Sequence, residues 1–194
     1  MERRAETNYT INEAIIKGKR SDTLAVFDLD DTLIISQAKI QVLDPKTHKV
    51  IKSLTPAEYN FFKPNKKVNL SFKEFEDYDI LKKSHFIHEV LNKLLNYYNS
   101  GVHVAIVTAR SDSKMIQRFF LENGIDIHDE LVIAISDPKL PYKGSVAEKK
   151  KQALQSLIEQ GYQDFIFFDD NEDNLRLAKE LEKESDVTVK TVKV

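Results

Sequence analysis

Three acidic residues follow directly on an apolar run near the start of the chain. Residues 24–32 read Leu-Ala-Val-Phe-Asp-Leu-Asp-Asp-Thr, so the acids are Asp28, Asp30 and Asp31. Side chains alternate along an extended strand, and Asp28 and Asp30 are therefore expected to project to the same side. Two carboxylates held that close repel each other unless a cation lies between them or one carries a proton. The stretch indicates either a site for a hard metal ion such as Mg²⁺ or a carboxylate nucleophile with an acid–base partner.

Two later apolar runs also end in polar residues. Thr108 and Arg110 follow residues 102–107, and Asp169 with Asp170 follows residues 165–168. In open parallel sheets, ligands bind beyond the carboxyl ends of the strands. We therefore expect these residues to meet Asp28 and Asp30 in one site.

The remaining pattern predicts the elements that hold this site. Near-continuous apolar runs predict strands, and apolar residues at helical spacing predict helices. The predicted strands span residues 24–29, 102–107, 131–135 and 165–168, and the predicted helices span residues 84–98, 113–123, 146–160 and 174–184. This alternation favours an α/β fold, a Rossmann-like three-layer sandwich with a mainly parallel sheet covered by helices on both faces.

An insertion after the first strand interrupts this regular pattern. Residues 39–54 resemble a hairpin around a turn-rich centre, and Thr55 followed by Pro56 marks a helix start. Residues 68–79 are mixed and acidic and receive no assignment. We expect an N-terminal arm over 1–22 and one domain over 23–194, with a small flap over about 36–83.

The four polar segments together resemble the motifs of one known family. Residues 27–32 (Phe-Asp-Leu-Asp-Asp-Thr) resemble the first motif, Asp-x-Asp-x-Thr, of the haloacid dehalogenase superfamily. Residues 107–110 (Val-Thr-Ala-Arg) resemble its second motif, a lysine in the helix before the fourth strand its third, and residues 168–174 its acidic fourth. The resemblance covers residues 24–181 and implies a haloacid-dehalogenase-like fold and phosphatase activity.

The resemblance also implies roles for individual residues. Asp28 would attack phosphorus and become a phospho-aspartate, and Asp30 would act as general acid and then general base. Asp28, the backbone carbonyl of Asp30 and Asp170 would hold Mg²⁺, which masks the charge repulsion between carboxylate and phosphate. Thr108 would bind the phosphoryl oxygens. The family's dehalogenase branch lacks the second acid and the metal, so phosphoryl transfer is favoured here, and Asp31 is a turn or supporting residue.

The motif-three lysine is ambiguous because Lys149, Lys150 and Lys151 are consecutive and Lys143 lies just upstream. Lys150 shares a helix face with Leu154 and Leu157, so we expect it to be the catalytic lysine. Lys149 is the second choice and a candidate substrate-binding residue.

Several residues within or beside these motifs have two possible roles. Arg110, with Ala109, is a candidate for binding substrate, although a surface ion pair is an equal alternative for Arg110. Asp169, Asp173 and Asn174 are expected to support the metal site. Helix capping, with Asn171 or Asp173 as the cap, is the alternative for the last two.

Composition limits the class of protein. The 194 residues are 41% hydrophobic and 31% charged, carry a net charge of −2 and include no cysteine, which excludes disulfides and thiolate chemistry. The chain has no signal-like start and no apolar run of membrane length, so we expect a cytoplasmic protein without a membrane partner.

The small flap predicts an open site without a large cap domain. Between residues 44 and 67 there are six lysines and two acids, a net charge of +4 (six minus two). Such a surface attracts polyanions, although a solvated surface in a lysine-rich protein is the favoured explanation. The leading hypothesis is a Mg²⁺-dependent phosphatase acting on phosphate monoesters, with nucleotides, nucleic-acid ends and sugar phosphates as the first substrate classes to test. The alternatives are a polynucleotide 3′- or 5′-end phosphatase and a non-catalytic phosphate- or Mg²⁺-binding regulatory protein, and an oligomer that closes the site is possible.

Overall fold

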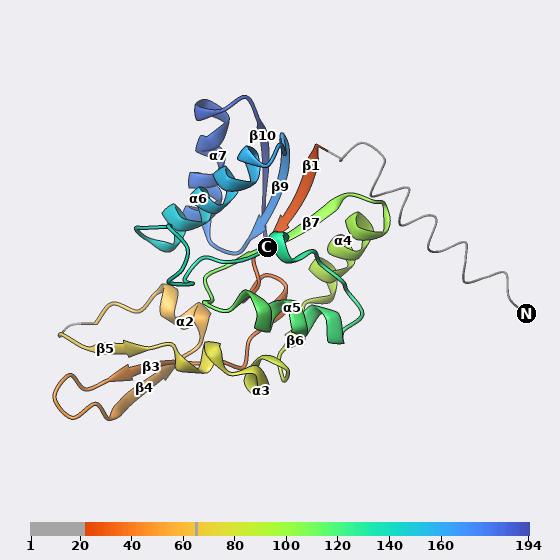
Figure 1. Ribbon diagram of the computed structural model, residues 1–194. Coiled ribbons are helices and arrows are strands. Elements are labelled where there is room, and N and C mark those ends of the chain that lie inside the picture. The colour runs from red at the N-terminus through yellow and green to blue at the C-terminus, as the bar shows by residue number, and fades with distance from the viewer. Residues whose placement is uncertain (1–21, 65) are drawn as a thin grey trace, which may run out of the picture.

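The computed structural model describes residues 22–64 and 66–194, and its centre is a five-stranded parallel sheet (Figure 1). The strand order is β10-β9-β1-β7-β8. The strands are β1 (Thr23–Phe27), β7 (His103–Thr108), β8 (Val132–Ala134), β9 (Asp164–Asp169) and β10 (Thr188–Lys193). Every pairing in this sheet is parallel. The predicted α/β class is therefore confirmed, and the predicted arm over residues 1–22 lies almost entirely outside the described residues.

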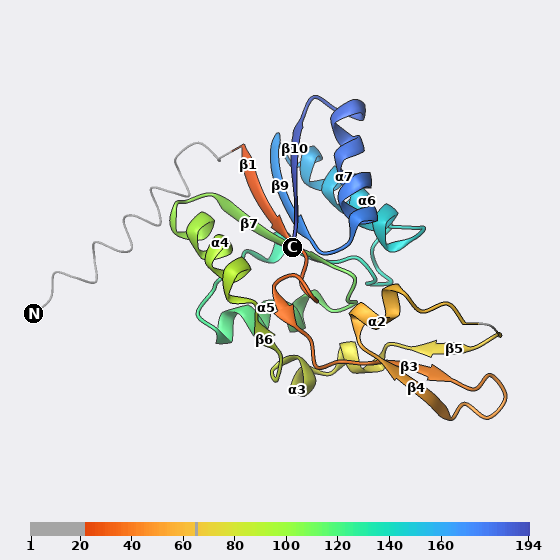
Figure 2. The same cartoon turned by 180° about the vertical axis from the view of Figure 1, so that it is seen from behind.

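Helices cover both faces of the sheet. They are α4 (His88–Asn99), α5 (Ser113–Glu122), α6 (Val146–Glu159) and α7 (Glu172–Glu184), with a short 3-10 helix η2 (Asp129–Leu131) before β8. The two views in Figures 1 and 2 show α6 and α7 on one side of the sheet and α4 and α5 on the other. The central strand β1 is consequently buried on both faces, and Leu24, Ala25, Val26 and Phe27 are all 0% exposed. Such burial is why its sequence is continuously apolar instead of alternating.

The predicted helix start at Ser84 is wrong. Residues His85–Phe86 form strand β6, which pairs with β2 (Ile34–Ile35) in a small antiparallel sheet. Ile87 is the N-cap of α4, and its backbone N–H donates to the carbonyl of Leu33. Pairing with a segment far away in sequence therefore keeps these residues extended, although their apolar spacing continues that of the helix.

The insertion folds as a small sheet with its own apolar cluster, here called the flap. Strands β3 (Ile40–Leu43) and β4 (Val50–Leu54) form the expected hairpin, and β5 (Asn69–Ser71) pairs with the other side of β3. The flap also contains α2 (Pro56–Asn60), the 3-10 helix η1 (Lys73–Glu76) and α3 (Tyr78–Leu81). Thr55 caps α2 as expected, in a reciprocal capping box with Glu58.

The flap has a separate core of buried apolar residues. Ile40, Val42 and Leu54 form this cluster, and Tyr59, Phe62, Val68 and Phe75 pack against it. In both views the flap lies beside the lower ends of the central strands (Figures 1 and 2). None of the helices in the described ranges is both long enough and apolar enough to span a bilayer.

Candidate active site

Three neighbouring strands end at the same edge of the sheet and deliver the polar residues of the site. Asp28 follows β1 directly, Thr108 is the last residue of β7, and Asp169 is the last residue of β9. The backbone N–H of Asp28 continues the ladder by donating to the carbonyl of Phe168 at 2.9 Å. The Phe27 and Phe168 rings stack 4.5 Å apart just before the site. These residues therefore gather because parallel neighbours end together, as the sequence pattern predicts.

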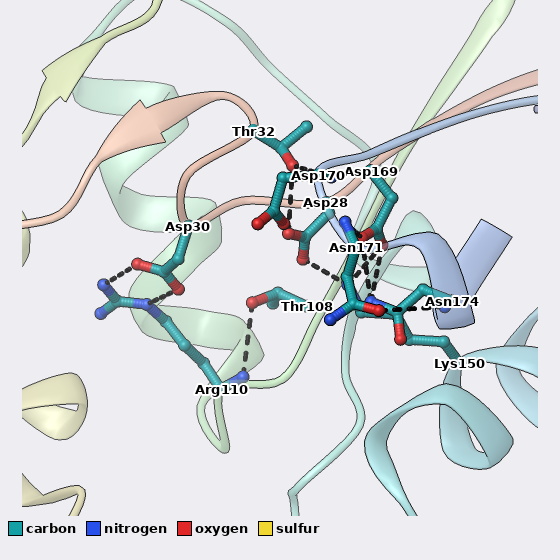
Figure 3. A network of polar contacts seen from close by, with 10 residues as sticks. All are labelled: Asp28, Asp30, Thr32, Thr108, Arg110, Lys150, Asp169, Asp170, Asn171 and Asn174. Atoms are coloured by element: carbon teal, nitrogen blue, oxygen red, sulfur yellow. Dashed lines mark hydrogen bonds and ion pairs between the residues drawn. The ribbon is translucent and has the colours of Figure 1, made fainter. Parts of the chain in front are cut away.

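Lys150 links two carboxylates across the site (Figure 3). Its Nζ lies 2.6 Å from Oδ1 of Asp28 and 2.7 Å from Oδ2 of Asp169, and the side chain is 2% exposed. Lys150 comes from the first turns of α6, whose buried face also carries Leu154 and Leu157. The structure thus brings Lys150 into the site. Lys151 instead forms ion pairs with Glu180 and Glu184.

Burial and crowding perturb the charges of this cluster. Burial raises the pKa of Asp28 to about 8; the Lys150 ammonium opposes this change, and the nearby charge of Asp169 adds to it. Burial disfavours the charge on Lys150, but the two carboxylates outweigh that effect and raise its pKa above the usual value. Burial, with repulsion from Asp169, raises the pKa of Asp170 to about 6. The site therefore holds more negative charge than its single lysine balances.

Asp169 is fully buried and held by hydrogen bonds from α7. Asn174 Nδ2 donates to Oδ1 at 2.9 Å and to Oδ2 at 3.1 Å, and the backbone N–H of Asn171 donates to Oδ1. Asn171 is also the N-cap of α7, because its Oδ1 accepts from the N–H groups of Asp173 and Asn174. The side chain of Asn174 therefore binds Asp169, and the cap of α7 is Asn171.

Thr32 joins the first and fourth motifs, and the sequence interpretation gave it no role of its own. Its Oγ1 donates to Oδ2 of Asp28 at 3.2 Å and accepts from the backbone N–H of Asp170 at 3.1 Å. The side chain is 0% exposed. The sequence did contain a signal for this role, because Thr32 is the last residue of the Asp-x-Asp-x-Thr pattern.

Asp30 faces away from the lysine and toward Arg110. Arg110 Nε and Nη2 donate to Oδ2 and Oδ1 of Asp30 at 2.9 and 2.7 Å, a bidentate ion pair that Figure 3 shows. Arg110 Nη1 donates to the Phe75 carbonyl at 3.0 Å, and Nη2 also reaches Ser36 Oγ at 3.2 Å. The ion pair that was the alternative for Arg110 is therefore present, but it is not on the surface: the side chains of Arg110 and Asp30 are 1% and 15% exposed. Through these contacts Arg110 connects the end of β7, the loop that follows β1 and the flap.

Three carboxylates lie close enough to share a cation. Oxygen atoms of Asp28, Asp169 and Asp170 all lie within 4.8 Å of one another. If all three are ionised, Lys150 leaves a net charge of −2 (minus three plus one), which a divalent cation neutralises. An all-oxygen set suits a hard cation. The buried acidic cluster can therefore hold a metal ion, and the side chain of Asp30 is not part of it.

A cavity of about 740 Å³ opens from these carboxylates toward the flap. Its lining includes the expected site residues Asp28, Asp30, Thr108, Ala109, Arg110, Lys150, Asp170, Asp173 and Asn174. In the described part of the chain, Lys149 and Lys143 are not among the lining residues. Thr108 is fully buried at the floor, where its Oγ1 accepts from the backbone N–H of Arg110 at 3.3 Å.

Comparisons with known proteins leave the family open. No protein-family model and no curated protein matches the chain. One solved structure that resembles it is the crystal structure of a hypothetical protein from Xanthomonas campestris, with 17% sequence identity and a TM-score of 0.32. The match covers 85% of this chain, which spans 63% of the other. The function must therefore be inferred from the site itself.

Proposed function

We propose that this chain is a Mg²⁺-dependent phosphatase that hydrolyses phosphate monoesters through a phospho-aspartate on Asp28, in the manner of the haloacid dehalogenase superfamily. The observation that carries the proposal is the placement of Asp28. This buried carboxylate lies at the end of the central strand, 2.6 Å from a buried lysine and in one cavity with a second acid, Asp30. The four motif segments that resemble the family converge on that cavity, which supports the proposal further.

The first step is nucleophilic attack by Asp28 on phosphorus. An Asp28 oxygen forms a bond to phosphorus, and the bond between phosphorus and the leaving oxygen breaks. Asp30 must enter this step in its protonated form, and it gives that proton to the leaving oxygen. Thr32 orients the Asp28 carboxylate through its hydroxyl, and Lys150 balances charge as the phosphoryl group arrives. Thr108 at the cavity floor donates its hydroxyl to a phosphoryl oxygen.

The second step releases phosphate and restores the enzyme. Asp30, now a carboxylate, takes a proton from a water molecule as that water attacks the phosphorus of phospho-Asp28. The bond between phosphorus and the Asp28 oxygen breaks, and inorganic phosphate leaves. One residue thus serves as acid in the first step and base in the second, which requires that Asp30 stay beside the leaving oxygen.

Arg110 provides that placement in the proposed mechanism. Its guanidinium contacts both oxygens of Asp30 and is itself fixed by the Phe75 carbonyl and Ser36. We therefore treat Arg110 as a positioning residue for Asp30, in place of the direct contact with substrate that the sequence suggested.

The metal in this proposal is Mg²⁺, which Asp28, Asp170 and the backbone carbonyl of Asp30 would hold, with Asp169 as a supporting residue. When bound, it would screen the negative charge of the phosphate from the attacking carboxylate. Asp169 is already saturated by Lys150, Asn171 and Asn174, so it fits a role of orienting its neighbours.

A phosphatase screen in Mg²⁺ tests the proposal. The purified protein should hydrolyse an aryl phosphate and members of a panel of nucleotides, sugar phosphates, phosphopeptides and phosphorylated oligonucleotides. Asp28→Asn should abolish turnover, whereas Asp79→Asn, an exposed acid in the first turn of α3, should not. Full activity in Asp28→Asn would refute the mechanism. Absence of hydrolysis across the panel, with Mg²⁺ shown to bind, would favour the non-catalytic alternative.

A further inference from the structure

One wall of the cavity is aromatic and comes entirely from the flap. Tyr59, Phe72 and Phe75 line the cavity, and Phe72 contacts each of the other two; we call the three residues the aromatic wall. The Tyr59 and Phe72 rings meet edge to face with centroids 5.6 Å apart, and the Phe72 and Phe75 centroids are 6.3 Å apart. Phe72 is 45% exposed. A large ring left exposed inside a cavity that also holds buried carboxylates indicates a binding surface rather than core packing.

The aromatic wall lies on the leaving-group side of the proposed reaction. Asp30 must reach the leaving oxygen, so it marks that side of the cavity. Arg110 connects Asp30 to the wall, because the same guanidinium that binds Asp30 donates to the Phe75 carbonyl and lies 5.1 Å from the centre of the Phe75 ring. A group attached to the leaving oxygen therefore extends from Asp30 toward the aromatic wall.

The charges around the cavity argue against a second anionic group on the substrate. Each cation that lines it within the described ranges is already paired: Lys150 with Asp28 and Asp169, Arg110 with Asp30, and Arg176 with Asp173 and Glu180. The lining also contains Asp31 and Glu76. None of the six flap lysines counted between residues 44 and 67 belongs to it. A further phosphate or a polynucleotide backbone would find no unpaired cation there.

We propose that the aromatic wall binds the planar ring of an uncharged leaving group, so that the substrate is a nucleoside monophosphate. The proposal rests on the proposed phosphatase function and names the substrate class for that site. Rings of bases stack on aromatic side chains without needing charge, which fits a wall of two phenylalanines and a tyrosine. A volume of about 740 Å³ is within the range of small-molecule sites.

A matched pair of substrates isolates the contribution of the base. Adenosine 5′-monophosphate and ribose 5-phosphate share the leaving oxygen and differ in the base. The expected kcat/KM for adenosine 5′-monophosphate is higher by about 5- to 150-fold, the range that one base–aromatic stack supports. Equal values for the two substrates would overturn the proposal while leaving the phosphatase function intact.

Variants in the flap test whether the preference for the nucleotide comes from the aromatic wall. Phe72→Ala should bring the ratio of the two kcat/KM values close to unity. Phe61→Ala is the matched control, because Phe61 is 85% exposed in the same flap and does not line the cavity, so it should keep the wild-type ratio. Equal losses on both substrates in Phe72→Ala would show that the wall does not hold the base. A preference for a 5′-phosphorylated oligonucleotide over the mononucleotide that disappears at high salt would also overturn the proposal, in favour of nucleic-acid ends.

Binding of adenosine alone separates this proposal from the phosphatase function. Calorimetric titration of the wild-type protein with adenosine should give saturable binding, weakened about 5-fold or more in Phe72→Ala and unchanged in Phe61→Ala. Such binding without hydrolysis of any ester would support the wall and refute the phosphatase. Hydrolysis without a base preference and without adenosine binding would support the phosphatase function and refute base binding by the aromatic wall.

Discussion

Replacing Lys150 by methionine should destabilise the fold far more than the same change at its neighbour Lys151. The Lys150 ammonium is 2% exposed and bridges Asp28 and Asp169 at 2.6 and 2.7 Å. Methionine keeps much of the apolar stem but removes the charge, so two buried carboxylates are left facing each other. Removing one partner of a buried ion pair costs about 3–5 kcal/mol.

Lys151 is a control of the same residue type one position along. It pairs with Glu184 at 2.6 Å and Glu180 at 3.4 Å near the surface, and its side chain is 18% exposed. Such pairs contribute about 0–1 kcal/mol, so Lys151→Met should cost no more than that. Helix periodicity selects Lys150 among three consecutive lysines, and this comparison tests that choice against Lys151.

Urea unfolding followed by circular dichroism, with a chelator present, gives both free energies. For a domain of this size, the expected loss in Lys150→Met corresponds to a fall in Tm of about 6–20 °C. Added Mg²⁺ should restore part of the loss, because a divalent cation can neutralise the same carboxylates. A cost below about 1 kcal/mol for Lys150→Met, or equal costs for the two variants, would refute the reasoning.

Three further predictions concern the metal, the acid and a helix cap. Mg²⁺ at 100 times its Kd should raise the free energy of unfolding by about 2.7 kcal/mol, and Asp170→Asn should remove most of that gain, as thermal unfolding with and without Mg²⁺ would show. Arg110→Lys should lower kcat by up to about 100-fold with a smaller change in KM, because a lysine cannot hold both oxygens of Asp30; steady-state kinetics with equal kcat in variant and wild type would contradict this. Asp112→Ala should cost about 1 kcal/mol by urea unfolding, because Asp112 accepts the Met115 N–H at the start of α5, whereas Asp112→Asn should be nearly neutral.

The sequence predicted the parallel sheet because its central strands are apolar on both faces and end in polar residues. It did not assign β10 (Thr188–Lys193), which reads Thr-Val-Lys-Thr-Val-Lys and so lacks a continuous apolar run; such a polar, lysine-containing sequence suits an edge strand. It also placed the start of α4 at Ser84. Apolar spacing cannot reveal that His85–Phe86 pairs with β2, since that pairing depends on chain about fifty residues away.

For the site too, local sequence patterns predicted some features, whereas contacts between distant segments could not be predicted. Helix periodicity selected Lys150 because the lysine must share the buried face of α6. Strand ends predicted that Arg110 and Asp30 lie at one edge of the sheet, but not that their side chains turn toward each other, because either could have faced solvent. The link from Arg110 to Phe75 was equally hidden, since residues 68–79 showed no periodic pattern. It is this contact that connects the flap to the proposed acid.

The most direct test of the central claim is to trap the intermediate. The wild-type protein is mixed with a substrate from the screen in Mg²⁺, quenched in acid within one turnover and analysed by mass spectrometry with peptide mapping. The account predicts one added phosphoryl group, on Asp28, and none in Asp28→Asn. A phosphoryl group on another residue, or steady turnover with no adduct in a quench fast enough to resolve it, would contradict a mechanism through phospho-Asp28.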